Sequence, residues 1–533
     1  MKKSLSGKNG GIRIHRNRFG IPVIEAESSV DLAFGLGWVH ALDRQLQTLL
    51  TRLALEGRLA EHLRGSERLA AMDVYVRRIL LLPDPDEEIA NLDPDIEKQL
   101  RAYAGGFNYY LSKHKPVYEL KLSGYRPEPW RIEHSLLTAK SFGYFGSVNF
   151  QDDNEKFLIQ MIQQGFDEGR IRELFPYLKE PFNRELIEKI KLEGPPVPDI
   201  VKWPGILPHF RASNNWAVSG ELTRSGKPIL CGDLHQELNQ IPCIWYEVVM
   251  ELPDNRFIGA TIPGVPWLII GRTKFTAWSP TSSLMSTMDY RIEHCRNGKY
   301  RRGQEWKEFK VREELIKVRK KEPVRIKIYE SEKGILEGDP AEEGYYLSRI
   351  WSVQRKSISN DFNVLARLPE AKTVKESMDL FKRMDSSSFN WVVADRDGNI
   401  GYQMSGRMHR KPEGMEGSVA LPAWDRRYDL DEFVSKDDLP STYNPSEGFI
   451  ATANNDLNHL GRVPVISIPD SSTRAERAAQ LLREGKLFDI EAMKRMQYDL
   501  YSAKAERFMR IIGPLLPGTK NGKILKSWDC IYA

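Results

Sequence analysis

A cluster of prolines between residues 194 and 208 divides the sequence into two parts with different periodicities. The run 194–198 reads Gly-Pro-Pro-Val-Pro, and Pro204 and Pro208 follow it. Because proline fixes φ and lacks an N–H, this density argues against a regular element and predicts an exposed connector over residues 195–212. We therefore predict a mostly helical part over residues 1–194 and a strand-rich part over residues 213–533.

The first part contains one long amphipathic stretch over residues 29–63. Its leucines recur at three- and four-residue steps, which is the spacing of one helix face. Ser28, three residues before Asp31, is a typical N-cap position. A short β unit is expected over residues 11–27. Further helices are expected over residues 87–112, 133–145, 154–166 and 183–192.

The second part alternates apolar and polar residues as strands do. We expect strands over residues 215–219, 229–231, 244–251, 256–261, 267–270, 289–295, 314–318, 324–329, 389–394 and 400–404. Helices return over residues 374–384, 472–485 and 490–512. Together the two parts predict the fold class α+β.

Composition and charge exclude several classes of protein. The chain of 533 residues is 41% hydrophobic and 28% charged, which indicates a globular protein. Its formal net charge of +5 is too small to indicate a nucleic-acid-binding protein. No apolar run reaches the length of a membrane span, and no apolar segment follows the basic N-terminus as in a signal peptide. We therefore expect a soluble cytoplasmic protein with neither a nucleic-acid nor a membrane partner.

The four cysteines show no metal-ligand spacing. They are Cys231, Cys243, Cys295 and Cys530, and none belongs to a CxxC pair. We expect four buried thiols, and a disulfide between Cys231 and Cys243 is the alternative. The phosphate-binding, dinucleotide, HExxH and GxSxG motifs are also absent from the sequence.

Several segments resemble one family in the same order along the chain. Residues 211–220, Arg-Ala-Ser-Asn-Asn-Trp-Ala-Val-Ser-Gly, are similar to the start of the catalytic chain of the penicillin acylase family of N-terminal nucleophile hydrolases. Taken alone, Ser-Asn-Asn is a turn. The other matching segments are 11–65, 226–230, 233–235, 277–281, 394–402 and 453–455. Chance does not readily produce so many segments in one order.

The resemblance implies a fold and a way of making the active enzyme. The fold is a four-layer αββα core, with a helical domain from the first chain. Cleavage between Ala212 and Ser213 would free Ser213 as a new N-terminus, and the two chains would stay together as a heterodimer. The Ser213 hydroxyl would be the nucleophile, and its own α-amine, with an ordinary pKa of about 7.7–8.0, would be the general base.

The resemblance carries over four further site residues. Asn454 matches the side-chain donor to the oxyanion, with Asn455 as the neighbouring alternative. Ser282 matches the position whose backbone N–H is the second donor. His235 matches a residue that orients the α-amine or hydroxyl, and a buried histidine without a catalytic role is its alternative reading. Arg474 matches an arginine that supports the amine and the asparagine.

The family often holds a structural Ca²⁺ between its two chains. Glu155 and Asp289 match two carboxylate positions, and Met288 would offer its backbone carbonyl. A further carboxylate position is Ser286 in this sequence. No cofactor is expected for catalysis, so calcium, bound by Glu155, Met288 and Asp289, is the one metal that the resemblance suggests.

The implied activity is hydrolysis of small N-acyl amides such as β-lactams or acyl-homoserine lactones. Family members continue well beyond the segment that residues 525–529 resemble, whereas this sequence stops at Ala533. We therefore expect a catalytic chain that is incomplete at its C-terminus. The alternatives are a catalytically inactive, truncated relative that acts as a binding remnant, and a peptidase or another amidase with the same nucleophile.

Overall fold

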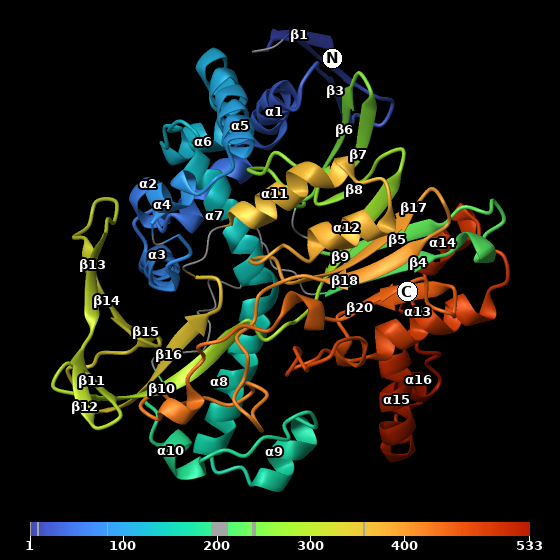
Figure 1. Cartoon of the computed structure of the whole chain (residues 1–533). Helices are drawn as coiled ribbons and strands as arrows, with labels where there is room; N and C mark the ends of the chain where they lie inside the picture. Colours follow the sequence, from blue (N-terminus) through green and yellow to red (C-terminus); the bar gives the residue numbers. More distant parts are fainter. Residues whose placement is uncertain are drawn as a thin grey trace.

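The computed structural model of the chain describes residues 2–7, 10–82, 84–192, 212–236, 241–354 and 358–532. The predicted connector over residues 195–212 lies outside the described residues, except for Ala212. The first part, up to residue 192, supplies three short strands and a series of helices (Figure 1). The second part supplies most of the strands and the later helices.

The predicted long helix forms as α1 (Ser29–Leu55), and the Ser28 side chain caps it by accepting from the Asp31 N–H. It ends eight residues earlier than residue 63 because Gly57 turns the chain with φ +62°, a conformation that favours glycine. The separate α2 (Leu59–His62) follows. Helix α1 packs along α5 (Pro94–Lys113), where Gly37 approaches the Tyr103 carbonyl so closely that an added Cβ would lie 2.1 Å from its oxygen.

The remaining helices of the first part lie around the α1–α5 pair and below it in the view of Figure 1. They are α3 (Glu67–Ile79), α4 (Pro85–Ala90), α6 (Tyr118–Ser123), α7 (Ile132–Gly143), α8 (Asn149–Gln163), α9 (Glu168–Leu174) and α10 (Arg184–Glu188). A π-helical turn, Tyr144–Val148, joins α7 to α8. Figure 1 shows α7 and α8 running down the middle of the molecule, beside strands of the second part.

The largest sheet has ten strands in the order β1-β2-β3-β6-β7-β8-β9-β17-β18-β20. Its strands are β1 (Lys2–Ser6), β2 (Gly11–Arg16), β3 (Pro22–Glu25), β6 (Tyr246–Leu252), β7 (Asn255–Thr261), β8 (Ile270–Arg272), β9 (Thr276–Ser282), β17 (Phe389–Asp395), β18 (Ile400–Met404) and β20 (Ser441–Tyr443). The two parts of the chain meet where β3 pairs in parallel with β6. The first part is therefore built into the sheet of the second.

A three-stranded sheet, in the order β21-β4-β5, packs on the ten-stranded one. Its strands are β4 (Ala212–Val218), β5 (Ile229–His235) and β21 (Phe449–Thr452). The Thr281 and Thr452 hydroxyls, one from each sheet, lie 3.0 Å apart. Helix α12 (Val374–Phe381) contacts β17 and β18, whereas α13 (Thr473–Glu484) and α14 (Ile490–Gln497) contact the small sheet (Figure 1).

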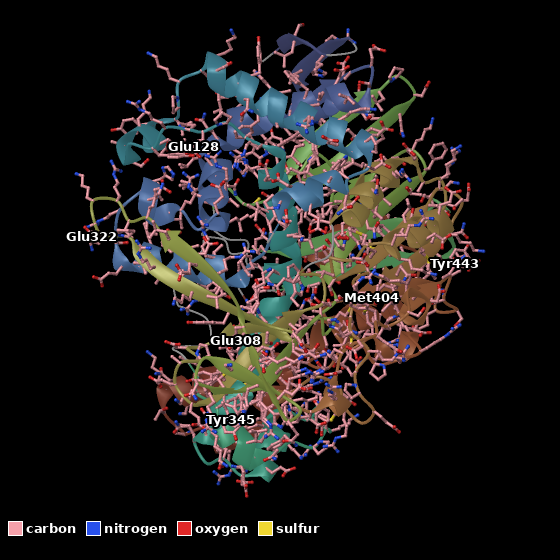
Figure 2. The ribbon with its side chains drawn as sticks, turned by 60° about the vertical axis from the view of Figure 1, so that its left-hand side comes forward. Glu128, Glu308, Glu322, Tyr345, Met404 and Tyr443 are labelled. Atoms are coloured by element: carbon pink, nitrogen blue, oxygen red, sulfur yellow. The ribbon has the colours of Figure 1, made fainter. Side chains whose placement is uncertain are left out.

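The third sheet lies apart from these two and extends the molecule to one side. Its eight strands are β10 (Met288–Arg296), β11 (Lys299–Arg302), β12 (Glu305–Glu308), β13 (Lys310–Ile316), β14 (Val324–Ser331), β15 (Gly334–Glu337), β16 (Gly344–Trp351) and β19 (Leu421–Pro422). In Figure 2, Glu322 marks the tip of the β13–β14 hairpin at the edge of the molecule. The other helices are α11 (Ser359–Arg367), α15 (Ala503–Ile512) and α16 (Lys520–Lys526).

The α+β prediction is confirmed, and several details differ. The strand expected over 267–270 includes only Ile270 of β8, whereas β9 and β16 were not predicted. The helix expected over 490–512 is broken into α14 and α15, and the one over 183–192 is only the five residues of α10. All four cysteines are free, but Cys243 is exposed, so the expectation of four buried thiols was wrong for this residue.

His40, on α1, ties the helical part to the large sheet. Its Nδ1 lies 2.8 Å from the Tyr103 hydroxyl on α5, and its Nε2 lies 3.0 Å from the Thr261 hydroxyl on β7. Burial, with a smaller contribution from Arg44, lowers the pKa of His40 to about 3. The folded protein therefore holds this imidazole neutral, in a place where protonation is costly.

We predict that His40 makes the fold sensitive to acid. Its folded pKa lies below the unfolded value near 6.5, so its contribution is present above that pH and is lost as the pH falls towards 3. Between pH 7.5 and pH 5 the loss amounts to about 2 kcal/mol of the free energy of unfolding. Urea unfolding at the two pH values should show a smaller difference for His40→Gln than for the natural chain.

The matched control is His459→Gln, because His459 is exposed. This variant should keep the pH dependence of the natural chain. An equal pH dependence for His40→Gln and the natural chain would contradict the assignment to His40.

Candidate active site

Ser213 is buried near the start of the central strand of the small sheet. It is the second residue of β4, it is 4% exposed, and it lies opposite Leu234 of β5. The Ala212–Ser213 peptide therefore lies within an ordered strand. Side chains of successive strand residues point to opposite faces, so Ser213 and Asn214 face different sides of the sheet.

Asn454 reaches Ser213 because of the pairing of β21 with β4. The last pair of this ladder is Thr452 with Asn215, so continuing the same register brings residue 454 level with Ser213. The backbone of Asn454 has φ +64°, which asparagine adopts more readily than most residues. Its Oδ1 accepts from the Ser213 backbone N–H at 3.0 Å, and its Nδ2 donates to the Ser213 hydroxyl at 3.2 Å. The Asn454 side-chain amide thus contacts both the backbone N–H and the hydroxyl of Ser213.

Arg474, in the first turn of α13, fixes this amide. Its Nη2 donates to Asn454 Oδ1 at 2.9 Å and to Asp470 Oδ2 at 3.1 Å. Its Nη1 donates to the Ser213 carbonyl at 2.9 Å and to Asn214 Oδ1 at 2.7 Å. Because Asn454 Oδ1 faces N–H donors from Arg474 and Ser213, the amide nitrogen must face the Ser213 hydroxyl.

Ser282, the last residue of β9, also lies beside this amide. Its carbonyl accepts from Asn454 Nδ2 at 2.8 Å and from Asn390 Nδ2 at 3.3 Å. Its hydroxyl donates to the Gly146 carbonyl in the π-helical turn at 2.8 Å. The structure thus places the Ser282 carbonyl beside the Asn454 amide, and the role of the Ser282 N–H as an oxyanion donor stays a prediction.

His235 lies on the other face of the small sheet. It is paired with Ala212, one residue before Ser213, so its side chain and that of Ser213 point to opposite faces. Its Nε2 lies 3.2 Å from Asn214 Nδ2 and 3.2 Å from Asp233 Oδ2. His235 therefore connects to the Ser213 group through Asn214 and Arg474, and a direct contact with the hydroxyl, as the resemblance suggested, is not formed in this uncut chain.

The sequence reasoning missed three polar neighbours, namely Asn214, Asp233 and Asp470. Two of them had a signal in the spacing. Asp233 precedes His235 by two residues on a strand, which puts both on one face. Asp470 precedes Arg474 by four residues, close to the start of a helix, where a carboxylate is favoured. Asn214 had no separate signal, because its partners come from β5 and α13.

A cavity of about 470 Å³ adjoins this second face. Its lining includes Asn214, Asp233, His235 and Arg474, together with apolar residues of α13 and α14 and polar residues near the start of α15. Ser213 is not among the lining residues, so the cavity lies across the strand from the serine hydroxyl.

The three residues predicted to bind calcium lie together between α8 and β10, but they do not fit Ca²⁺ as placed. Gln151 Nε2 donates to Glu155 Oε1 at 2.8 Å and to the Met288 carbonyl at 2.7 Å. The Lys411 ammonium contacts Asp289 Oδ1. Burial, with a smaller contribution from the Asp289 charge, raises the pKa of Glu155 well above its ordinary value. Three of the oxygens that Ca²⁺ would need, Glu155 Oε1, the Met288 carbonyl and Asp289 Oδ1, therefore face N–H donors, whereas Asp289 Oδ2 is buried without a hydrogen-bond partner among the described residues.

No group of three or more His, Cys, Asp or Glu side chains arranged for a metal ion occurs among the residues that the structure describes. Within the same residues, no helix is both long and apolar enough to span a bilayer.

Comparison with known proteins identifies the family. The family model described as penicillin amidase matches residues 11–533. The chain belongs to the penicillin amidase family. An acyl-homoserine lactone acylase of Pseudomonas aeruginosa is 30% identical over 96% of this chain, and the match covers 63% of that relative. A penicillin acylase 2 proenzyme of a Pseudomonas species is 29% identical over 99% of this chain and 70% of its own length.

A solved structure supports the family fold. The thermostable penicillin G acylase of Alcaligenes faecalis superimposes with a TM-score of 0.51, over 60% of this chain and 59% of that one, at 21% sequence identity. Membership of the penicillin amidase family accounts for the mixed helices and sheets. This chain spans less than two thirds of the length of the Pseudomonas aeruginosa acyl-homoserine lactone acylase.

Proposed function

We propose that this chain is a self-processing hydrolase of N-acyl amides. The observation that carries the proposal is that one amide, Asn454, contacts both the backbone nitrogen and the hydroxyl of Ser213, at 3.0 and 3.2 Å. Cleavage of the Ala212–Ser213 peptide would turn that nitrogen into an α-amine without moving it. A hydroxyl and its general base would then belong to the same residue.

The proposed reaction has two steps. In the first, the Ser213 hydroxyl attacks the amide carbonyl carbon, and its proton passes to the neutral α-amine and then to the leaving amine, so the C–N bond breaks and an acyl ester remains. In the second, water attacks the ester carbonyl carbon and the α-amine takes a proton from this water. The amine passes the proton to Ser213 Oγ as the ester C–O bond breaks, so the carboxylic acid leaves and the Ser213 hydroxyl is restored. Asn454 Nδ2, with the Ser282 N–H, would stabilise the negative charge on the carbonyl oxygen.

Each of the other residues has a positioning role in this scheme. Arg474 holds Asn454 Oδ1 and the Ser213 carbonyl, so both groups keep their place when the peptide is cut. His235 lies opposite Ala212, the residue that the cut would separate from Ser213. We propose that it acts on the freed α-amine through Asn214, whose amide contacts both His235 and Arg474.

The names of two relatives support a substrate class for this chain. Their names specify acyl-homoserine lactones and penicillins, both of which carry an acyl group on a nitrogen. We propose that the substrate is a small N-acyl amide of this kind. We also propose that the two chains stay associated as a heterodimer, since β3 pairs with β6 across the cut, and that the two stacked sheets and their helices form an αββα core.

Cleavage before Ser213 should depend on the Ser213 hydroxyl. Ser213→Ala should remain a single uncut chain, because the same hydroxyl performs processing and catalysis. Intact-mass measurement of the purified natural chain should show a fragment that begins at Ser213, and this fragment should be absent from the variant. The control is Ser219→Ala, just beyond the end of the same strand, which should be cut normally.

Normal cleavage in Ser213→Ala would overturn the nucleophile assignment. A natural chain that also stays uncut would favour the inactive, truncated relative. Cleavage without turnover of any N-acyl amide, including acyl-homoserine lactones and β-lactams, would separate processing from the proposed activity, and peptides would then be the substrates to test.

Turnover should depend on the Asn454 amide as a donor to the oxyanion. Asn454→Ala should lower the turnover of a cleavable N-acyl amide by about 10²–10³, since one donor to the developing charge is lost. The measurement is kcat on protein whose cleavage has been verified by mass. The control is Asn455→Ala, because the Asn455 amide contacts the Ala453 N–H and not Ser213. Equal losses in the two variants, or a loss in Asn455→Ala alone, would refute the assignment to Asn454.

A further inference from the structure

A buried polar cluster joins the two parts of the chain where α8 passes β10 (Figure 1). Helix α8 supplies Gln151 and Glu155, which are 5% and 2% exposed. Strand β10 supplies Met288 and Asp289, and a loop further along the chain supplies Lys411. The first two residues precede the proposed cut, whereas the other three follow it, so this cluster is a junction between the two proposed chains.

Lys411 places a positive charge in this junction. Its side chain is 7% exposed and that of Asp289 is 8% exposed, and the ammonium contacts Asp289 Oδ1. The ammonium also lies 3.4 Å from the Ser286 carbonyl. Ser286 is the position at which the resemblance to the family implies a further carboxylate of the calcium site. A buried carboxylate needs a cationic or hydrogen-bonding partner, and Lys411 is the cation that meets Asp289.

Gln151 occupies the neighbouring oxygens. Its Nε2 donates to the Met288 carbonyl at 2.7 Å, to Glu155 Oε1 at 2.8 Å and to the Gly417 carbonyl at 3.3 Å. Its Oε1 accepts from the Met288 N–H at 3.4 Å. A neutral amide from the first part thus satisfies Glu155 Oε1 and the Met288 carbonyl, two of the oxygens that the resemblance assigns to calcium.

The space beside Asp289 Oδ1 is also filled. A Cβ added at Gly417, where φ is +82°, would lie 2.8 Å from Lys411 Cε, 3.1 Å from its Nζ and 3.2 Å from Asp289 Oδ1. The lysine therefore packs directly against the backbone of this loop. A Ca²⁺ ion needs six to eight oxygens around it. Here the Lys411 ammonium and the Gln151 amide nitrogen occupy the place that the ion would take among these oxygens.

We propose that the Lys411 ammonium, together with the Gln151 amide, replaces a structural calcium ion at the junction between the two parts. The charge that neutralises Asp289 is then covalently part of the chain, and the junction needs no metal. This inference does not depend on the proposed activity, because it concerns only the stability of the fold.

The first experiment measures metal content and melting of the natural 533-residue chain. After dialysis, elemental analysis should show calcium well below one ion per chain. The melting temperature should be the same in millimolar CaCl₂ as in EDTA, because a ligand that does not bind the folded state cannot stabilise it. Stoichiometric calcium, or a lower melting temperature in EDTA, would overturn the proposal.

The second experiment tests the charge. Lys411→Met should lower the melting temperature by at least about 3 °C, because Asp289 loses its cation. Lys411→Arg keeps a positive charge, so its melting temperature should fall by less. The control is Lys321→Met, since Lys321 is exposed, and it should melt like the natural chain.

Adding Asp289→Asn to Lys411→Met should restore part of the loss, because the carboxylate that the ammonium neutralises is then gone. Losses that simply add in the double variant, or an unchanged melting temperature for Lys411→Met, would overturn the role of Lys411. Should Lys411→Met fail to fold, the metal content and EDTA response of the natural chain still decide the question.

Discussion

The amide of Asn454 is the contact on which the candidate site depends. It lies where β21 continues past its last pair with β4, and the left-handed backbone of Asn454 turns the side chain onto Ser213. Arg474 then leaves this amide a single orientation, with its oxygen towards the nitrogen of Ser213 and its nitrogen towards the hydroxyl. The ladder of the small sheet, and the helix α13 that presents Arg474, therefore set the geometry of any chemistry at Ser213.

Among the contacts that hold the helical part against the rest, two junctions use buried polar side chains. At one, the neutral imidazole of His40 joins α1 and α5 to β7. At the other, Gln151 on α8 contacts carbonyls beside β10. Groups of this kind are directional, so they fix how the two parts fit together, whereas apolar packing alone tolerates sliding. The side chains that contact Ser213, those of Asn454 and Arg474, come from the second part of the chain, and the first part meets the site at the Gly146 carbonyl, which accepts from Ser282.

The sequence predicted the helices best, because α1 and α5 carry apolar stripes that repeat with the helical period. It failed at β9, where Pro280 argues against an inner strand. The structure tolerates this proline because β8 pairs only with Ala277 and Trp278 of β9, so one side of the strand is unpaired by β8 at Pro280. The strand expected over 267–270 failed for a related reason, since a short apolar run does not reveal whether it is paired or merely buried.

The site was predictable to the extent that it lies in contiguous motifs. Ser213 and Asn454 each fall in a segment that resembles the family, Arg474 matches an arginine of the family, and the structure brings the three together. Lys411 had no such signal. It lies 122 residues from Asp289, and a lysine in a polar stretch of sequence gives no indication that its charge is buried. Long-range pairs of this kind follow from the packing of distant segments, which local patterns do not encode.

The parallel pairing of β3 with β6 has a consequence for refolding. While the chain is continuous, these strands find each other at the high effective concentration that a covalent connection provides. The proposed cut before Ser213 would turn the same pairing into an encounter between two molecules. The refolding rate of the cut protein would then depend on its concentration, and that of the precursor would not. Cleavage would thus convert a fold that can reform by itself into one that persists mainly because it unfolds slowly.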